Sequence, residues 1–262
     1  MKETSRAGAD APGFWERLVL ELRTGRRLGR VIAVAAPKGG VGKTFIAVNA
    51  AWHLAEDAGK SVGLISVAYG GREAPRREAT VAEPIARGTV RSINNVAEAD
   101  LDDVVRRTAE FADFVIVDTP NSLSDIVAGA VAQADDVLVV SNHERTGAKG
   151  ATSLLAMLQE SGFDMKRAHL VVGETTRDLS LGIEDVLLLT GVPTAWLVPF
   201  EPSASKFGPA APVAIRAPQS PAARALRAMA NGILAQQQPG PRNLPIALPV
   251  ADFHRQGVAA RR

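Results

Sequence analysis

Residues 31–44 read VIAVAAPKGGVGKT, an apolar run followed by a glycine-rich loop that ends in a lysine and a threonine. An unbroken run of small and β-branched residues is typical of a buried parallel strand. Gly39, Gly40 and Gly42 allow the backbone to curl so that its N–H groups point inward at an anion. The stretch therefore predicts a strand, a phosphate-binding loop and a helix directly after it.

Two side chains at the end of this loop suit a nucleotide and its metal ion. The ammonium of Lys43 can neutralise β- and γ-phosphate charge, and the Thr44 hydroxyl is a ligand that Mg²⁺ accepts. Residues 44–56 are apolar at helical spacing and lack proline and internal glycine, so a helix N-terminus adds its positive field. A loop that is only a turn is the alternative, but strand, loop, lysine, hydroxyl and helix stand in the required order. We therefore predict binding of ATP or ADP with Mg²⁺.

The remainder of the chain alternates apolar runs with helical patterns. Strands are predicted over 59–65, 114–118, 136–140, 168–172 and 195–198, and helices over 147–158, 181–189 and 220–234. Strands that are apolar throughout and separated by helices indicate a parallel sheet covered on both faces. The predicted fold class is α/β, a doubly wound, mostly parallel sheet with helices on both faces.

A carboxylate follows one of these predicted strands. Residues 114–120 read FVIVDTP, so Asp118 stands at a strand end, where its carboxylate has little freedom and can organise a Mg²⁺ shell. The alternative is that Asp118 caps a helix starting near Ser122. Ser122 and Ser124 could do that instead, so we assign Asp118 to the metal.

The loop resembles the deviant Walker A motif of the ParA/MinD family of dimerising ATPases, because Lys38 precedes the two glycines. Residues 59–65 and 114–120 resemble the second strand and the Walker B strand of that family, and the likeness covers residues 30–236. It implies an ATP-dependent homodimer in which Lys38 reaches the nucleotide of the partner subunit. The residues that it implies for nucleotide binding are Lys38, Gly39, Gly40, Val41, Gly42, Lys43, Thr44, Phe45, Pro199, Phe200 and Glu201, with Lys38, Lys43 and Asp118 serving catalysis.

The chain departs from the family pattern in three places. Ser66 and Ala68 stand where the family has two aspartates that orient water and organise the metal shell, which predicts slow hydrolysis. Glu174 stands where an adenine-contacting asparagine is expected, so the resemblance gives no base selectivity. Efficient hydrolysis would require another acid, for which Glu174 and Asp125 are candidates.

Composition excludes several relatives within the same superfamily. With zero cysteines, the chain cannot hold an iron–sulfur cluster by thiolates or form a disulfide, which fits a reducing cytoplasm. Its only tyrosine, Tyr69, lies beside the second predicted strand, which argues against a kinase with an autophosphorylated tail. The sequence contains no run of about 18 apolar residues, so it predicts no membrane-spanning helix. We expect a cytoplasmic protein, peripheral at most to membrane or nucleoid.

The ends of the chain differ in character from its centre. Residues 14–22 carry an apolar stripe at helical spacing, which either packs on the domain or docks on a partner protein or membrane. The tail after residue 236 is punctuated by proline. We expect an extension over 1–29, an ATPase domain over 30–236 and a flexible tail over 237–262.

Arginines gather in two parts of the sequence. They are Arg23, Arg26, Arg27 and Arg30 before the first strand, and Arg72, Arg76 and Arg77 after the second. Although the formal net charge is only +2, such patches can contact DNA phosphates or anionic lipid. A solvated face is the alternative interpretation.

Three functional classes follow from these observations. The first is a nucleotide-dependent dimerisation switch that positions a cellular assembly. Within it, residues 212–213 and 220–227 resemble the TadZ/CpaE pilus-localisation branch. The second class is a DNA-binding partition ATPase that uses the arginine patches, and the third is a scaffold that binds nucleotide without hydrolysing it.

Overall fold

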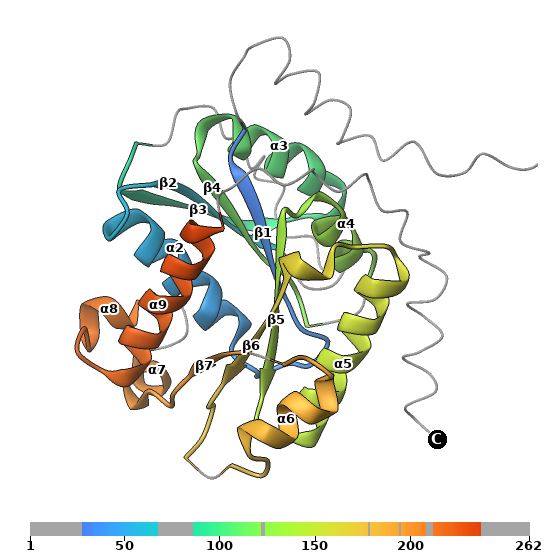
Figure 1. Ribbon diagram of the computed structural model, residues 1–262. Coiled ribbons are helices and arrows are strands. Elements are labelled where there is room, and N and C mark those ends of the chain that lie inside the picture. Colours follow the sequence, from blue (N-terminus) through green and yellow to red (C-terminus); the bar gives the residue numbers. More distant parts are fainter. Residues whose placement is uncertain are drawn as a thin grey trace, which may run out of the picture.

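The computed structural model describes residues 28–67, 86–121, 124–177, 179–193, 195–207 and 212–236. In this part of the chain, seven strands form one sheet in the order β3-β2-β4-β1-β5-β6-β7 (Figure 1). Every strand pair is parallel. The strands are β1 (Arg30–Ala35), β2 (Ser61–Val67), β3 (Thr89–Val96), β4 (Phe114–Asp118), β5 (Asp136–Asn142), β6 (Ala168–Gly173) and β7 (Trp196–Val198).

Helices cover both faces of the sheet, as the two apolar cores show (Figure 1). One face carries α2 (Lys43–Glu56), α7 (Pro202–Phe207), α8 (Val213–Arg216) and α9 (Pro221–Ala235). The other carries α3 (Leu101–Phe111), α4 (Asp125–Gln133), α5 (Arg145–Glu160) and α6 (Ile183–Thr190), and short 3₁₀ turns span Glu98–Asp100 and Met165–Arg167. The predicted fold class is confirmed. No helix in the described ranges has the length and apolar character needed to cross a membrane.

The strand order determines where a ligand can bind. β1 lies between β4 and β5, so that β2 to β4 lie on one side of it and β5 to β7 on the other. In open α/β sheets, ligands bind beyond the carboxyl ends of the strands where the strand order reverses. The phosphate-binding loop follows β1 directly, so it lies at that switch point.

The predicted elements are present, with ends that shift by at most two residues. The second strand, for example, runs from Ser61 to Val67 instead of 59–65, so Ser66 belongs to it. Elements that were not predicted are β3, α3, α7 and α8. The apolar stretch 14–22, the remaining arginines of both patches, Ala68, Tyr69, Ser122 and the tail 237–262 lie outside the described residues.

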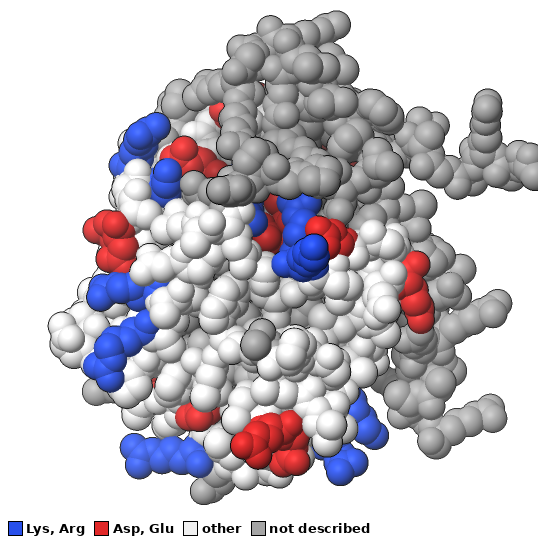
Figure 2. Space-filling view, in the orientation of Figure 1, with Lys and Arg blue, Asp and Glu red and all other residues white. Residues whose placement is uncertain are grey.

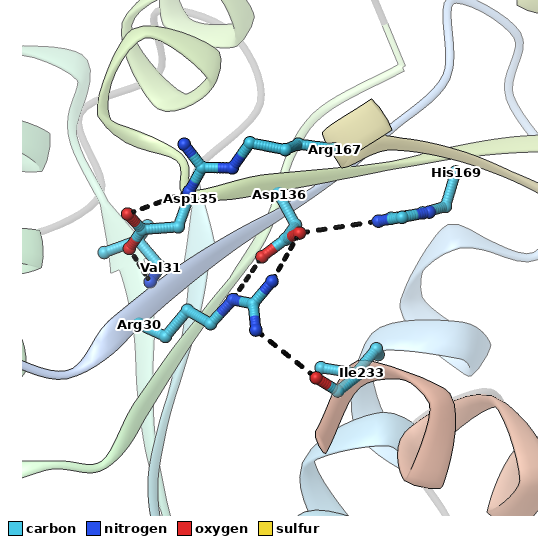
Figure 3. Close-up of polar contacts among 7 residues, drawn as sticks. All are labelled: Arg30, Val31, Asp135, Asp136, Arg167, His169 and Ile233. Atoms are coloured by element: carbon cyan, nitrogen blue, oxygen red, sulfur yellow. Dashed lines mark hydrogen bonds and ion pairs between the residues drawn. The ribbon is translucent and has the colours of Figure 1, made fainter. Parts of the chain in front are cut away.

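Arg30 corrects the interpretation of the first arginine patch. Its guanidinium forms a two-pronged ion pair with Asp136, with Nη2 donating to Oδ1 at 2.7 Å, and Nη1 donates to the Ile233 carbonyl (Figure 3). His169 contacts the same carboxylate at 3.4 Å. Only 18% of the Arg30 side chain is exposed. Arg30 therefore links β1 to β5 and α9, because Asp136 is the first residue of β5 and Ile233 lies in α9. It is not a free surface cation.

Candidate nucleotide-binding site

The phosphate-binding loop joins the carboxyl end of β1 to the first turn of α2. Gly40 and Gly42 have φ angles of 77° and 98°, in the left-handed region that side chains disfavour. Gly42 is the residue that caps α2, which begins at Lys43. A loop of this shape at a helix N-terminus gathers backbone N–H groups around an anion, as the sequence predicted.

The side chain of Lys43 lies inside this loop. The residue is 8% exposed, and its Nζ donates to the Lys38 carbonyl oxygen at 3.3 Å. Burial lowers the pKa of Lys43, while the nearby Asp118 carboxylate opposes the shift. An anion bound in the loop would favour the charged amine further. Lys43 is thus a buried cation whose ammonium lies near the Asp118 carboxylate and donates to a backbone carbonyl.

Thr44 and Asp118 meet across the loop, although 74 residues separate them in the sequence. The Thr44 hydroxyl donates to Oδ2 of Asp118 at 2.7 Å. Asp118 is 8% exposed, and burial raises its pKa against the opposing effects of the Thr44 hydrogen bond and the Lys43 charge. The sequence placed both residues near the metal, and the structure brings them into contact.

These two side chains fit a Mg²⁺ ion. The second carboxylate oxygen, Oδ1 of Asp118, is buried and has no hydrogen-bond partner among the residues that the structure describes, and such an atom calls for an explanation. Mg²⁺ typically takes one or two protein oxygens and completes its shell with phosphates and water. The described residues hold no group of three or more His, Cys, Asp or Glu that could bind a metal.

Lys38 is partnered within its own chain. Its Nζ forms an ion pair with Oε2 of Glu144, the residue that precedes α5. About a third of the Lys38 side chain and half of the Glu144 side chain are exposed (32% and 48%). The Lys38 hydrogen bond is the leading cause that lowers the pKa of Glu144. Because both groups are near the surface, the pair can exchange partners at small cost.

Ser66 lies beside Asp118 at the carboxyl edge of the sheet. The strand registers pair Ser66 with Asp118 on one side and with Asn94 on the other. Paired residues of parallel strands point to the same face, so Ser66 and Asp118 share the face that α2 covers. The position at which the family resemblance implies an aspartate is thus next to Asp118 in the sheet, and it carries a hydroxyl.

The residues that the family resemblance assigns to the base lie in the segments after β6 and β7. Oε2 of Glu174 accepts a hydrogen bond from the Phe200 backbone N–H at 3.0 Å, and the Arg177 guanidinium carbon lies 6.0 Å from the centroid of the Phe200 ring. Glu201 is buried, and its Oε1 accepts from the Ser203 N–H at the start of α7. Glu201 therefore caps a helix, whereas Glu174 and Phe200 face each other.

The remaining predicted residues divide into supporting and distant positions. Val41 is 1% exposed and anchors the loop in the core beneath α2, against which Phe45 also packs. Pro199 is half-buried between β7 and Phe200. Asp125 is exposed at the start of α4. The alternative acid Glu174 lies beyond β6, separated from Asp118 by β1 and β5.

Two residues at the site were missed by sequence reasoning. Glu144 follows β5 and was not singled out, although its position at the carboxyl end of a central strand was a usable signal. Asn121 lies against the loop, because a Cβ built on Gly39 would come within 2.5 Å of its Nδ2. Asn121 directly follows the segment 114–120 that was already assigned to the metal site.

A parallel sheet with a phosphate-binding loop at its switch point and an apposed hydroxyl–carboxylate pair defines a P-loop NTPase. A sequence model of the ParA family, described as NUBPL iron-transfer P-loop NTPase, matches residues 27–89. The chromosome-partitioning ATPase Soj of Thermus thermophilus is 31% identical over 248 residues, which cover 80% of this chain and 97% of the relative. The chain belongs to the ParA/MinD family of P-loop NTPases.

Solved structures agree with this assignment at the level of the fold. The septum site-determining protein MinD of Pyrococcus horikoshii, complexed with Mg-ADP, matches with a TM-score of 0.65 and 18% identity over 80% of this chain and 98% of that one. The MinC:MinD cell division complex of Aquifex aeolicus matches with a TM-score of 0.63 and 23% identity over 82% and 99%.

Proposed function

We propose that this protein is an ATP-dependent dimerisation switch that positions a cellular assembly and hydrolyses ATP slowly on its own. The observation that carries the proposal is the contact between Thr44 and Asp118 beside the loop, with Oδ1 of Asp118 buried and unpartnered. The loop amides and Lys43 would hold the phosphates. Thr44 and Asp118 would hold Mg²⁺, which neutralises phosphate charge when bound.

Dimerisation is proposed from the position and the present partner of Lys38. Two triphosphates that face each other across an interface repel, and a cation supplied by each subunit offsets that repulsion. Lys38 is a partly exposed cation at the rim of the loop, paired with Glu144 in the isolated chain. In the dimer, Lys38 exchanges Glu144 for the nucleotide of the partner subunit. An exposed pair of this kind is weak enough to allow the exchange.

Slow hydrolysis is proposed from the residues around Asp118. Ser66 shares its face and carries no charge, and Asn94 continues the row on the next strand. A hydroxyl can hold a water molecule but is a poor base. The switch would then remain in its ATP state until a partner protein supplies the missing group or the nucleotide dissociates.

The assembly that is positioned is proposed by analogy. The relative Soj is a chromosome-partitioning ATPase, and one matching structure holds MinD with MinC. We favour a pilus or secretion assembly, reached through a protein partner, because residues 212–213 and 220–227 resemble the TadZ/CpaE branch. On the face shown in Figure 2, lysines and arginines lie interspersed with acidic residues, without a single-sign patch among the described side chains.

A DNA-binding partition ATPase is the second candidate, favoured by the 31% identity with Soj. Retention on DNA that falls steeply as salt rises would identify it, because phosphate contacts release counterions. If the protein is not retained on DNA even at low salt, the DNA-binding candidate is excluded and the switch that acts through a protein partner remains. Arg30 would not contribute to such binding, because Asp136 holds it.

Sedimentation velocity with a non-hydrolysable ATP analogue and Mg²⁺ tests the switch. We expect a dimer with the analogue and a monomer without it, and Lys38→Ala should abolish the dimer while leaving nucleotide binding in place. Glu144→Gln, which frees Lys38 from its cis partner, should not weaken the dimer, and Lys149→Ala serves as an exposed lysine control. A monomer at all concentrations, or a dimer indifferent to Lys38→Ala, would refute the proposal.

A further inference from the structure

Gly39 differs from the other two glycines of the phosphate-binding loop in what it allows. Gly40 and Gly42 have positive φ angles, whereas Gly39 does not, so the backbone conformation does not require glycine there. A Cβ built on Gly39 would come within 2.5 Å of Nδ2 of Asn121 and 3.5 Å of its Cγ. The missing side chain therefore lets the Asn121 carboxamide approach the backbone of the loop.

The Asn121 carboxamide lies beside the groups that suit the metal ion and the outer phosphates. It follows Asp118 by three residues, and the Asp118 carboxylate accepts the hydrogen bond at the proposed Mg²⁺ site. On its other side, the Lys43 ammonium donates to the carbonyl of Lys38, the residue before Gly39. A lysine at the end of such a loop reaches the β- and γ-phosphates, and the same two phosphates share the Mg²⁺ ion. The γ-phosphate of a nucleotide held in the loop would thus lie within reach of Asn121.

A carboxamide suits this position because of the groups that it presents. It carries two N–H donors and no charge, so it can donate to a phosphate oxygen, and the exposed side chain of Asn121 leaves these donors accessible to a ligand. A diphosphate in the same loop would leave the donors without this partner. A carboxamide is also not a base that could take a proton from water, so the contact is compatible with slow hydrolysis.

We propose that Asn121 is a specificity-determining residue, which donates a hydrogen bond to the γ-phosphate and makes the site prefer ATP to ADP. The inference rests on the nucleotide-binding function proposed above and deepens it, because a switch needs a group that responds to the γ-phosphate. Gly39 is the positioning residue for this contact, since its missing side chain leaves room for the carboxamide.

Calorimetry with Mg²⁺ tests this role by comparing ADP with a non-hydrolysable ATP analogue. Full chains that carry Lys38→Ala are used, so that contacts across the proposed dimer do not contribute. In this background, Asn121→Ala should lower the affinity for the analogue about tenfold or more and leave the affinity for ADP unchanged, as expected for one hydrogen bond to a charged group. Asn231→Ala, at an exposed position of α9, is the matched control and should change neither affinity.

Two further variants separate the hydrogen bond from a packing role. Asn121→Asp keeps the size of the side chain but replaces the donors by a negative charge, so it should weaken binding of the analogue more than Asn121→Ala does. Gly39→Ala adds a methyl group where the carboxamide lies, so it should lower the preference for the analogue, and combining it with Asn121→Ala should add little. Tighter binding of the analogue by Asn121→Asp, or fully additive losses in the double variant, would contradict the proposal.

The binding of ADP separates this inference from the function on which it rests. If both ligands bind in a way that depends on Lys43, but Asn121→Ala changes the ratio of their affinities by less than about threefold, the role of Asn121 is wrong and the nucleotide site stands. If the wild type binds neither ligand, the proposed function and the role of Asn121 both fail.

Discussion

Asp118 shows how one residue can serve function at the expense of stability. Burial raises its pKa, and its Oδ1 has no hydrogen-bond partner in the described part of the chain. A buried carboxylate is disfavoured in its charged form, yet only that form attracts a metal ion. The sequence predicts a metal-binding role for Asp118 from its place after an apolar strand, but it did not predict its burial, which depends on neighbours distant in the chain.

Asp118→Asn should stabilise the nucleotide-free protein and weaken Mg²⁺-dependent nucleotide binding at least tenfold. Because the folded-state pKa is raised, the ionised carboxyl group opposes folding at neutral pH, and this penalty is lost as the pH falls through the raised pKa toward the ordinary value of about 4. The Tm of the variant should therefore exceed that of the wild type at pH 7, and the difference should shrink on acidification. Thermal unfolding with EDTA and calorimetry with Mg²⁺ measure the two effects, and a lower Tm at pH 7 would contradict the account.

Ser66→Asp should raise steady-state ATP turnover more than tenfold, because it places a carboxylate in register with Asp118 on the face that α2 covers. Phosphate release by the purified protein is the measurement. Ser92→Asp adds the same charge at an exposed position of β3 and should have no effect. Rapid hydrolysis by the wild type alone would show that another group, such as Asn121, aligns the water.

Lys38 marks the limit of what the loop motif could predict. The motif identified the residue, but its partner Glu144 lies 106 positions away. Such a contact depends on β1 and β5 being neighbours, which no local pattern reveals. The same holds for the hydrogen bond between Glu174 and Phe200.

Among the elements, strands that are apolar throughout could be predicted from the sequence, whereas a polar strand could not. β1, β4 and β5 are buried almost throughout, and each was visible as a continuous apolar stretch. β3 reads TVRSINNV and is largely exposed at the sheet edge, so it had no such signal. Helix α3 did have one, since Leu101, Val104, Val105, Thr108 and Ala109 are buried at helical spacing.

The ion pair between Arg30 and Asp136 joins β1 to β5, and breaking it should be costly. Arg30→Met would leave a buried carboxylate uncompensated, at a cost of about 3 kcal/mol in the free energy of unfolding. The double variant Arg30→Met, Asp136→Asn should recover part of the loss. Urea denaturation measures both, and equal losses in the single and double variants would contradict the pairing.

The same pair should make stability depend on pH. Burial opposes ionisation of Asp136, but hydrogen bonds from His169 and Arg30 hold its pKa below the ordinary value. A depressed folded-state pKa contributes stability above about pH 4, and the contribution is lost as the pH falls through the depressed pKa. Asp136→Asn should remove this part of the acid sensitivity in the same denaturation experiments.

At the scale of the whole molecule, the sequence predicted the layers but not the order of the strands. Alternation of strands and helices required a parallel sheet, yet several orders satisfy that pattern. The observed order places β1 between β4 and β5. That arrangement brings Thr44, Asp118 and Glu144 around one loop, so the site is a product of the topology.

The central claim is that this loop binds a nucleoside triphosphate through its amides and Lys43. Calorimetric titration of Mg²⁺-ATP into the wild type, Lys43→Ala and the exposed control Lys149→Ala tests it most directly. We expect binding by the wild type and the control, and a loss of roughly a hundredfold in affinity for Lys43→Ala, because hydrogen bonds to charged groups each contribute about 1.5–3 kcal/mol. Equal affinity of Lys43→Ala and the wild type, or no binding by the wild type, would contradict it.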